Sequence, residues 1–158
     1  MKVADRRPGT IPMARLLAMG YRWMIDELHT NLRARGWQGI RPAYGFVLLA
    51  LRDESLTPTA LGAVLDVSKQ AASKLADAMV LDGLLTRDSD ELDHRARRLR
   101  LTPRGVQLLG AVEEIYSELE HVWADIIGDV AVRQTKSRLT TVLTAVHGGT
   151  LPTIRPVT

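Results

Sequence analysis

The stretch that decides the predicted fold of this 158-residue chain is residues 57–83, which read TPTALGAVLDVSKQAASKLADAMVLDG. Thr57 stands before a proline, and an N-cap residue followed by proline predicts the start of a short helix. Ser68 can cap a second helix, and Gly83 supplies the stop at its C-terminal end. Because only the tight turn at residues 66–68 joins the two helices, the stretch predicts a helix-turn-helix.

The second of these helices, predicted over residues 69–82, has two unlike faces. At about 100° per residue, the polar side chains fall within an arc of roughly 140°. The polar face consists of Lys69, Gln70, Ser73, Lys74 and Asp77, and the apolar face of Ala71, Ala72, Leu75, Ala76 and Met79. Gln70 can present a donor and an acceptor to an adenine edge, while Ser73 and the lysines can reach bases or phosphates. An exposed helix face is usually polar, so the pattern also fits a helix that faces only solvent.

The space between the two short helices is expected to hold a small apolar core. Its members are predicted to be Leu61, Leu65, Val67 and Leu75. Gly62 stands where the helices cross, and a side chain there would collide with the neighbouring helix. Asp66 occupies the turn, where helix-turn-helix proteins often have glycine, but aspartate tolerates the left-handed conformation better than most residues. The turn is therefore compatible with this sequence.

The segment after the second helix has the pattern of a basic hairpin. Residues 84–88 and the alternating residues 98–101 are predicted to form strands, joined by a polar loop over residues 89–95. The formal net charge is only +3, but residues 94–104 carry five arginines and no carboxylate, which focuses positive charge there. Arginine suits phosphates or a narrow minor groove, and the candidates on the projecting loop are Arg95, Arg97 and Arg98. Together these features predict a winged helix-turn-helix.

Longer helices are predicted on both sides, so the expected fold class is mainly α with a small β-hairpin wing. Apolar side chains recur at helical spacing over residues 13–35 and 103–127, and further helices are expected from Pro42 and after Gly128. The longest helices have more apolar surface than a small domain covers, which favours a homodimer, although both could pack on their own domain. The predicted organisation is a flexible N-terminal arm (1–12), an N-terminal dimerisation helix (13–40), a winged DNA-binding region (41–104), C-terminal dimerisation helices (105–148) and an extended tail (149–158).

Two segments resemble the multiple antibiotic resistance regulator (MarR) family of bacterial transcription factors: residues 67–87, VSKQAASKLADAMVLDGLLTR, and residues 93–105, DHRARRLRLTPRG. The wing pattern of that family is matched by Asp93, Arg95, Arg97, Arg98, Leu101, Thr102 and Gly105. The resemblance extends over roughly residues 13–148. It implies a homodimer with intertwined terminal helices that binds double-stranded DNA at successive half-sites of a pseudopalindrome, most often as a repressor.

The resemblance also implies roles for single residues. Asp93 would brace the wing by pairing with Arg95, and Arg95 would reach the minor groove, with Arg97 and Arg98 beside it. The recognition-helix positions are occupied by Ser68, Lys69, Gln70, Ser73 and Lys74.

Members of the MarR family often bind small phenolic or aromatic acids between the dimerisation region and the winged domain, so the resemblance implies a comparable effector site. Its lining would include Trp23, His29, Trp37, Tyr44 and Tyr116, with Arg41 as the partner of a carboxylate. Aromatic residues at helical intervals are more often part of a core, and spacing alone does not separate the two interpretations.

Composition excludes several other functions. The absence of cysteine excludes disulfides, thiolate chemistry and Cys-ligated zinc, and the four histidines have no metal-ligand spacing. No phosphate loop, nucleophile elbow or metalloprotease motif is present, so neither an enzyme nor a cofactor is predicted. The sequence has no evident signal peptide or membrane span, and the protein is expected to be soluble and cytoplasmic.

Two other classes of function remain open at this point. A winged domain can serve as a protein-interaction module that binds no DNA. A small enzyme is the other alternative, with acid–base chemistry from Glu113, Glu114, Glu118 and Glu120. On a long helix such a cluster is more often a solvated face.

Overall fold

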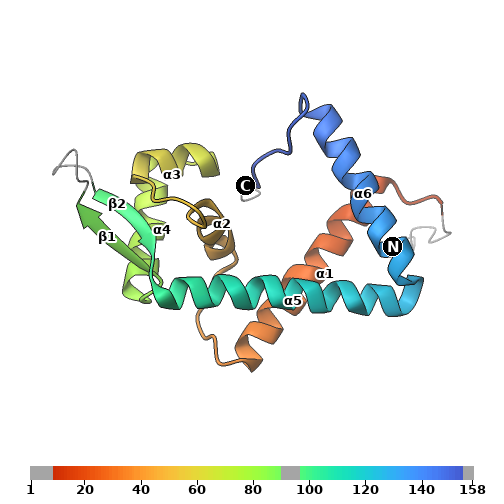
Figure 1. The fold of residues 1–158 in the computed structure, drawn as a ribbon, viewed down its shortest axis with the longest axis horizontal. Coiled ribbons are helices and arrows are strands. Elements are labelled where there is room, and N and C mark those ends of the chain that lie inside the picture. Colours follow the sequence, from red (N-terminus) through yellow and green to blue (C-terminus); the bar gives the residue numbers. More distant parts are fainter. Residues whose placement is uncertain (1–8, 90–96, 155–158) are drawn as a thin grey trace, which may run out of the picture.

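The computed structural model describes residues 9–89 and 97–154 of the chain (Figure 1). The elements, in chain order, are α1 (Met13–Ala34), α2 (Pro42–Ala50), α3 (Pro58–Leu65), α4 (Lys69–Leu81), β1 (Leu85–Ser89), β2 (Arg97–Leu101), α5 (Pro103–Ile127) and α6 (Asp129–Val146). The long helix α5 runs through the molecule, with the hairpin, α3 and α4 at one end and α6 at the other (Figure 1). The predicted fold class, mainly α with a β-hairpin wing, is confirmed.

Side-chain caps begin three of these helices where the sequence predicts them. Thr57 precedes α3 and Thr102 precedes α5, and each hydroxyl oxygen accepts a hydrogen bond of 3.1 Å from the backbone N–H three residues later. Ser68 caps α4 in the same way, also at 3.1 Å. Because each such cap contributes about 0.5–2 kcal/mol, local sequence is sufficient to set these helix starts.

The hairpin is held to the rest of the protein by backbone hydrogen bonds between β2 and a residue just before α3. Leu56, just before α3, exchanges two hydrogen bonds with Leu99 of β2, with N···O distances of 3.2 and 2.7 Å. The strands differ from the prediction by one residue, so Arg97 lies in β2 and not on the loop. Arg98 is a strand residue, in agreement with the strand predicted over residues 98–101. The base of the wing is therefore held on both sides of β2.

The winged end has a continuous apolar core. Leu61 and Leu65 of α3 are buried as predicted, and Val67 and Leu75 are partly buried against them. Other members of this core are Ala72, Ala76, Met79, Leu84, Leu99, Leu108 and Ile115. The wing, α3, α4 and the first half of α5 are consequently packed around shared side chains.

At the winged end, two glycines allow a helix to lie unusually close to a neighbouring stretch of backbone. A Cβ on Gly62 would lie 3.0 Å from the carbonyl oxygen of Val67, so the expected collision is real but involves the backbone of the turn. Gly105, near the start of α5, is tighter, because a Cβ there would lie 2.2 Å from the carbonyl oxygen of Leu84. This second approach is a tertiary contact between α5 and the residue before β1, and the spacing of residues in the sequence does not predict it.

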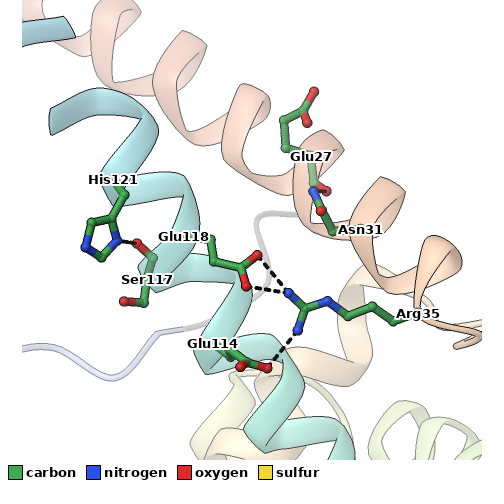
Figure 2. A network of polar contacts seen from close by, with 7 residues as sticks. All are labelled: Glu27, Asn31, Arg35, Glu114, Ser117, Glu118 and His121. Atoms are coloured by element: carbon green, nitrogen blue, oxygen red, sulfur yellow. Dashed lines mark hydrogen bonds and ion pairs between the residues drawn. The ribbon is translucent and has the colours of Figure 1, made fainter. Parts of the chain in front are cut away.

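Helix α1 crosses α5, and two kinds of contact join them. The rings of Trp23 and Trp123 lie with their centroids 6.1 Å apart. At the C-terminal end of α1, the Arg35 guanidinium donates to the carboxylates of Glu114 at 2.7 Å and Glu118 at 2.6 Å (Figure 2). Among the helices described, none is long and apolar enough to cross a membrane.

Candidate nucleic-acid interface

Helix α4 presents a polar face to solvent at the winged end. Lys69, Gln70 and Lys74 are exposed and Ser73 is half-buried. The buried residues of the helix are Ala72, Ala76 and Met79. Within the described ranges neither lysine forms a salt bridge, so both ammonium groups are available to an anion. The polar and apolar faces predicted for this helix are present, except that Ala71 is exposed.

The turn before α4 sets the direction of the polar face. Asp66 has φ 57° and ψ 42°, the left-handed conformation that aspartate tolerates better than most residues. The Val67 N–H donates to the carbonyl oxygen of Gly62 at 2.9 Å, which closes the end of α3. Ser68 then caps α4 with its hydroxyl, so this predicted DNA-contact residue also has a structural role.

An ion pair joins α4 to the wing. Asp77, the one acid on the polar face, pairs with Arg87 of β1. The pair neutralises a carboxylate that would otherwise repel phosphates, and it links the helix to the first strand. Sequence reasoning missed the pair because the partners are ten residues apart and in different elements. Only the return of the chain after α4 brings them together.

The arginines of β2 have different surroundings. Arg97 is exposed at the start of the strand. Arg98 donates from Nε to the Ser55 hydroxyl at 2.8 Å and from Nη2 to the Ser55 carbonyl oxygen at 2.6 Å. Arg100 forms an ion pair of 3.2 Å with Asp88. The hydrogen bonds of Arg98 direct its side chain toward the segment before α3, which gives it a bracing role within the protein.

The tip of the wing lies outside the described residues. It includes Asp93 and Arg95, the implied brace and the implied minor-groove contact. Their roles, and the predicted DNA contacts of Arg97 and Arg98, stay predictions.

A mainly apolar cavity of about 260 Å³ lies between α1, α2 and α5. Three of the predicted effector residues, His29, Arg41 and Tyr116, are in its lining. Burial, followed by the charge of Arg33, lowers the pKa of His29, so its imidazole is neutral at pH 7. Burial also raises the pKa of Tyr116 to about 12. Arg41 is therefore the cation among the three predicted residues that line the cavity at neutral pH.

The other three predicted effector residues lie outside this lining. Trp23 packs at the crossing of α1 and α5, and the Arg104 guanidinium carbon lies 4.9 Å from the centroid of the Trp37 ring. Tyr44 is fully buried, and its hydroxyl donates to the carboxylate of Asp82 at 2.7 Å. Aromatic spacing did not distinguish core from cavity at these positions. Cavity-lining residues that the sequence analysis did not single out include Tyr21, Met24, Phe46 and Leu49.

Four carboxylates of α5 are ion-paired at the surface. The pairs are Glu113 with Arg52, Glu114 and Glu118 with Arg35, and Glu120 with Lys136. Each carboxylate has a cationic partner from another element, so the cluster cross-links α5 to its neighbours. This arrangement fits a solvated helix face better than a pair of acid–base catalysts in a cleft.

Known proteins share both this fold and part of this sequence. A family model described as the MarR family matches residues 38–96, which include α2, α3, α4 and β1. The reduced form of MarR from E. coli has a similar structure, with a TM-score of 0.72 and 25% identity over 86% of this chain and 99% of that one. The resemblance to the MarR family is confirmed.

Two further proteins are similar to this chain, one in structure and one in sequence. A mutant of MepR from S. aureus, solved bound to an oligodeoxyribonucleotide, has a TM-score of 0.61 and 22% identity over 86% of this chain and 99% of that one. A putative transcriptional regulatory protein for the hcr operon of Thauera aromatica is 31% identical over 78 residues, or 49% of this chain. The matched segment spans 47% of that relative, about half its length. The match to the MarR family model thus covers most of the winged region, whereas the likeness in structure extends over most of the chain.

Proposed function

We propose that this chain is a sequence-specific, double-stranded DNA-binding transcription regulator that acts as a homodimer. The observation that carries the proposal is the exposed polar face of α4, with Lys69, Gln70 and Lys74 on the outer side of a winged helix-turn-helix. The other side of α4 is packed in the core, so the polar face is held rigidly, as groove contact requires. The MepR mutant, a protein of the same fold, supports the proposal because it was solved with an oligodeoxyribonucleotide.

The polar face would make two kinds of contact with DNA. Gln70 would pair with an adenine edge in the major groove, and Lys69 and Lys74 would contact phosphates. Arg97, together with Arg95 as the family resemblance implies, would enter the adjacent minor groove. Asp77 does not oppose this approach, because Arg87 neutralises its charge.

A second copy of the chain would cover the apolar surface at the α6 end of α5. The large apolar side chains exposed there include Met13, Leu16, Leu17, Met19, Val122, Ile126, Ile127, Val130, Val142 and Val146. A groove of about 380 Å³ lies between α1, α5 and α6 in the same region. Many exposed apolar side chains together with a groove lined by Leu16, Leu17 and Ile127 are typical of an interaction site. The resulting homodimer would present two α4 helices to half-sites about 34–36 Å apart.

The cavity between α1, α2 and α5 would bind a small aromatic acid as the effector. Its apolar wall suits an aromatic ring, and Arg41 supplies the cation for a carboxylate. A ligand that favours a dimer with a different separation of its α4 helices would release DNA. The loss of DNA affinity is limited by the difference between the ligand's affinities for that dimer and for the DNA-binding dimer. Repression follows if the DNA-bound dimer occupies a promoter.

Selection of duplexes from a random DNA pool by the purified protein tests the proposal. The expected winners are pseudopalindromes whose half-sites are about one helical turn apart. Winners without this symmetry contradict the homodimer on paired half-sites. If no duplex is retained even at low ionic strength, the proposal is wrong and the protein-interaction module is favoured. The mass of the same preparation, measured in solution, separates a failure to dimerise from a failure to bind DNA.

A further inference from the structure

The C-terminal segment turns back from α6 toward the winged half of the molecule (Figure 1). Gly148 and Gly149 have φ values of 74° and 101°, which glycine adopts without strain. The Gly149 N–H donates to the carbonyl oxygen of Thr144 at 2.9 Å, which closes α6. The chain then continues without helix or strand through residues 151–154, with a proline at position 152. These residues cross from the end of α6 to α2.

Ile154 reaches the effector cavity proposed above. It lines that cavity together with Phe46 and Leu49 of α2. It also lines a neighbouring hollow of about 180 Å³, whose wall includes Val64 of α3 and Thr153. Because Phe46, Leu49 and Ile154 belong to both hollows, Ile154 lies on the boundary between them, over the outer face of α2.

The contact of Ile154 with α2 is apolar but incomplete. Its side chain is 63% exposed, Leu49 is exposed and Phe46 is half-buried. The stabilisation from an apolar contact scales with the area that leaves water, so a contact of this size is weak. A weak contact across a cavity can be displaced by a ligand that covers the same apolar surface more completely.

We propose that residues 150–154 form a strap across the effector cavity, in which Ile154 competes with the ligand for the face of α2 formed by Phe46 and Leu49. The inference rests on the effector site of the proposed function. A closed strap lowers the fraction of molecules that can bind, and the apparent dissociation constant is the intrinsic one divided by that fraction. Weakening the Ile154 contact should therefore tighten binding while the other cavity walls stay intact.

Titration of the full-length protein with 8-anilinonaphthalene-1-sulfonate, an aromatic anion that fluoresces in apolar sites, tests the strap. We expect the dissociation constant to fall about three- to tenfold in Ile154→Ser, as it should if the strap is closed in most molecules. Leu151→Ser is the matched control. Leu151 belongs to the same strap and is 56% exposed, but it lines a separate hollow with His147 and not the effector cavity. Its substitution should leave the dissociation constant unchanged.

Gly45→Leu provides the control for the site itself. Gly45 lines the cavity and a Cβ there meets nothing within 4 Å, so a leucine fills the cavity from α2. Loss of probe binding in this variant assigns binding to the cavity. If binding is so assigned but Ile154→Ser binds no more tightly than the wild type, or Leu151→Ser tightens equally, the strap is overturned and the effector site stands.

If neither the wild type nor Ile154→Ser binds the probe, or Gly45→Leu retains full binding, the effector site and the strap are both overturned. The duplex selection described above tests DNA binding independently of these outcomes.

Discussion

The winged end and the α6 end of the molecule differ in where their apolar side chains lie. At the winged end, residues of α3, α4 and the hairpin are buried in one core, and the surface of α4 is polar. At the other end, α6 has a single buried residue, Val132, while Ile126 and Val146 are largely exposed. The difference indicates that the winged end is stabilised by contacts within one chain. At the α6 end, apolar side chains that would be buried in a core are exposed, as the proposed homodimer requires.

The largest effect is expected where the winged end is packed most closely. Gly105→Ala places a Cβ 2.2 Å from the carbonyl oxygen of Leu84, so the start of α5 must move away from the hairpin. We expect the free energy of unfolding to fall by about 3 kcal/mol, measured by urea denaturation. Gly110→Ala is the control, because a Cβ there meets nothing within 4 Å, and it should gain up to about 1 kcal/mol. Equal stability of the two variants would show that the two elements are not in close contact.

Substitutions at the α6 end should weaken dimerisation. Ile126 is 76% exposed. Ile126→Lys is expected to raise the dissociation constant of the dimer about 30-fold, because each of the two symmetry-related copies loses about 1 kcal/mol from partial apolar burial, or about 2 kcal/mol in all. Leu81 is 88% exposed at the winged end, so Leu81→Lys should leave the dimer unchanged. Sedimentation equilibrium measures both constants. If Ile126→Lys associates as tightly as Leu81→Lys, the apolar end is not the interface.

The polar face of α4 should show two separable effects on DNA binding. Gln70→Ala is expected to cost about 1–3 kcal/mol at one base position of each half-site, and to relax the preference there. Lys74→Ala should weaken binding to all duplexes and make the affinity less dependent on salt, because one phosphate in each half-site then keeps its counterion. Gel-shift titrations at several salt concentrations, on the selected duplex and its single-base variants, distinguish these patterns. The assigned roles fail if both substitutions affect every duplex alike.

The smallest effect concerns the link between α2 and the end of α4. Tyr44→Phe removes the hydrogen bond to Asp82 and should cost about 1 kcal/mol at pH 7. Burial, with this hydrogen bond, raises the pKa of Tyr44 to about 12, against about 10 in an unfolded chain. Its contribution to stability is therefore present below pH 10 and is lost as the pH rises toward 12. The variant should lose stability less steeply over that interval in urea denaturation.

Tyr116→Phe is the control for this link. Burial raises the pKa of Tyr116 to about 12 as well, so its removal should also reduce the loss of stability between pH 10 and 12. Tyr116 lines the cavity and has no hydrogen bond to Asp82. Its substitution should cost less than Tyr44→Phe at pH 7, and an equal cost would mean that the Asp82 bond contributes nothing.

Sequence reasoning succeeded where the signal is local. Thr57, Ser68 and Thr102 each precede a helix, and their caps depend on an amide only three residues away. The polar face of α4 follows from helical periodicity for the same reason, and Asp66 takes the left-handed conformation that its place in the turn demands.

Sequence reasoning failed where partners come from distant parts of the chain. Arg98 lies in the strand predicted over residues 98–101, but its hydrogen bond to Ser55, 43 residues earlier, was not predicted. Tyr44 and Tyr116 look alike in a helical pattern, but one is buried against Asp82 and the other lines the cavity. Helical periodicity predicts on which face of a helix a residue lies. It does not predict which other helix or strand packs against that face.

The sequence alone predicted the order of the helices, the basic segment and the unlike faces of α4. These features depend on capping, charge and periodicity, which are properties of neighbouring residues. The pairing of Asp77 with Arg87, the approach of Gly105 to Leu84 and the position of Ile154 over α2 required the folded chain. Such contacts depend on how whole helices and strands pack in space, and that packing is decided by the shared apolar core.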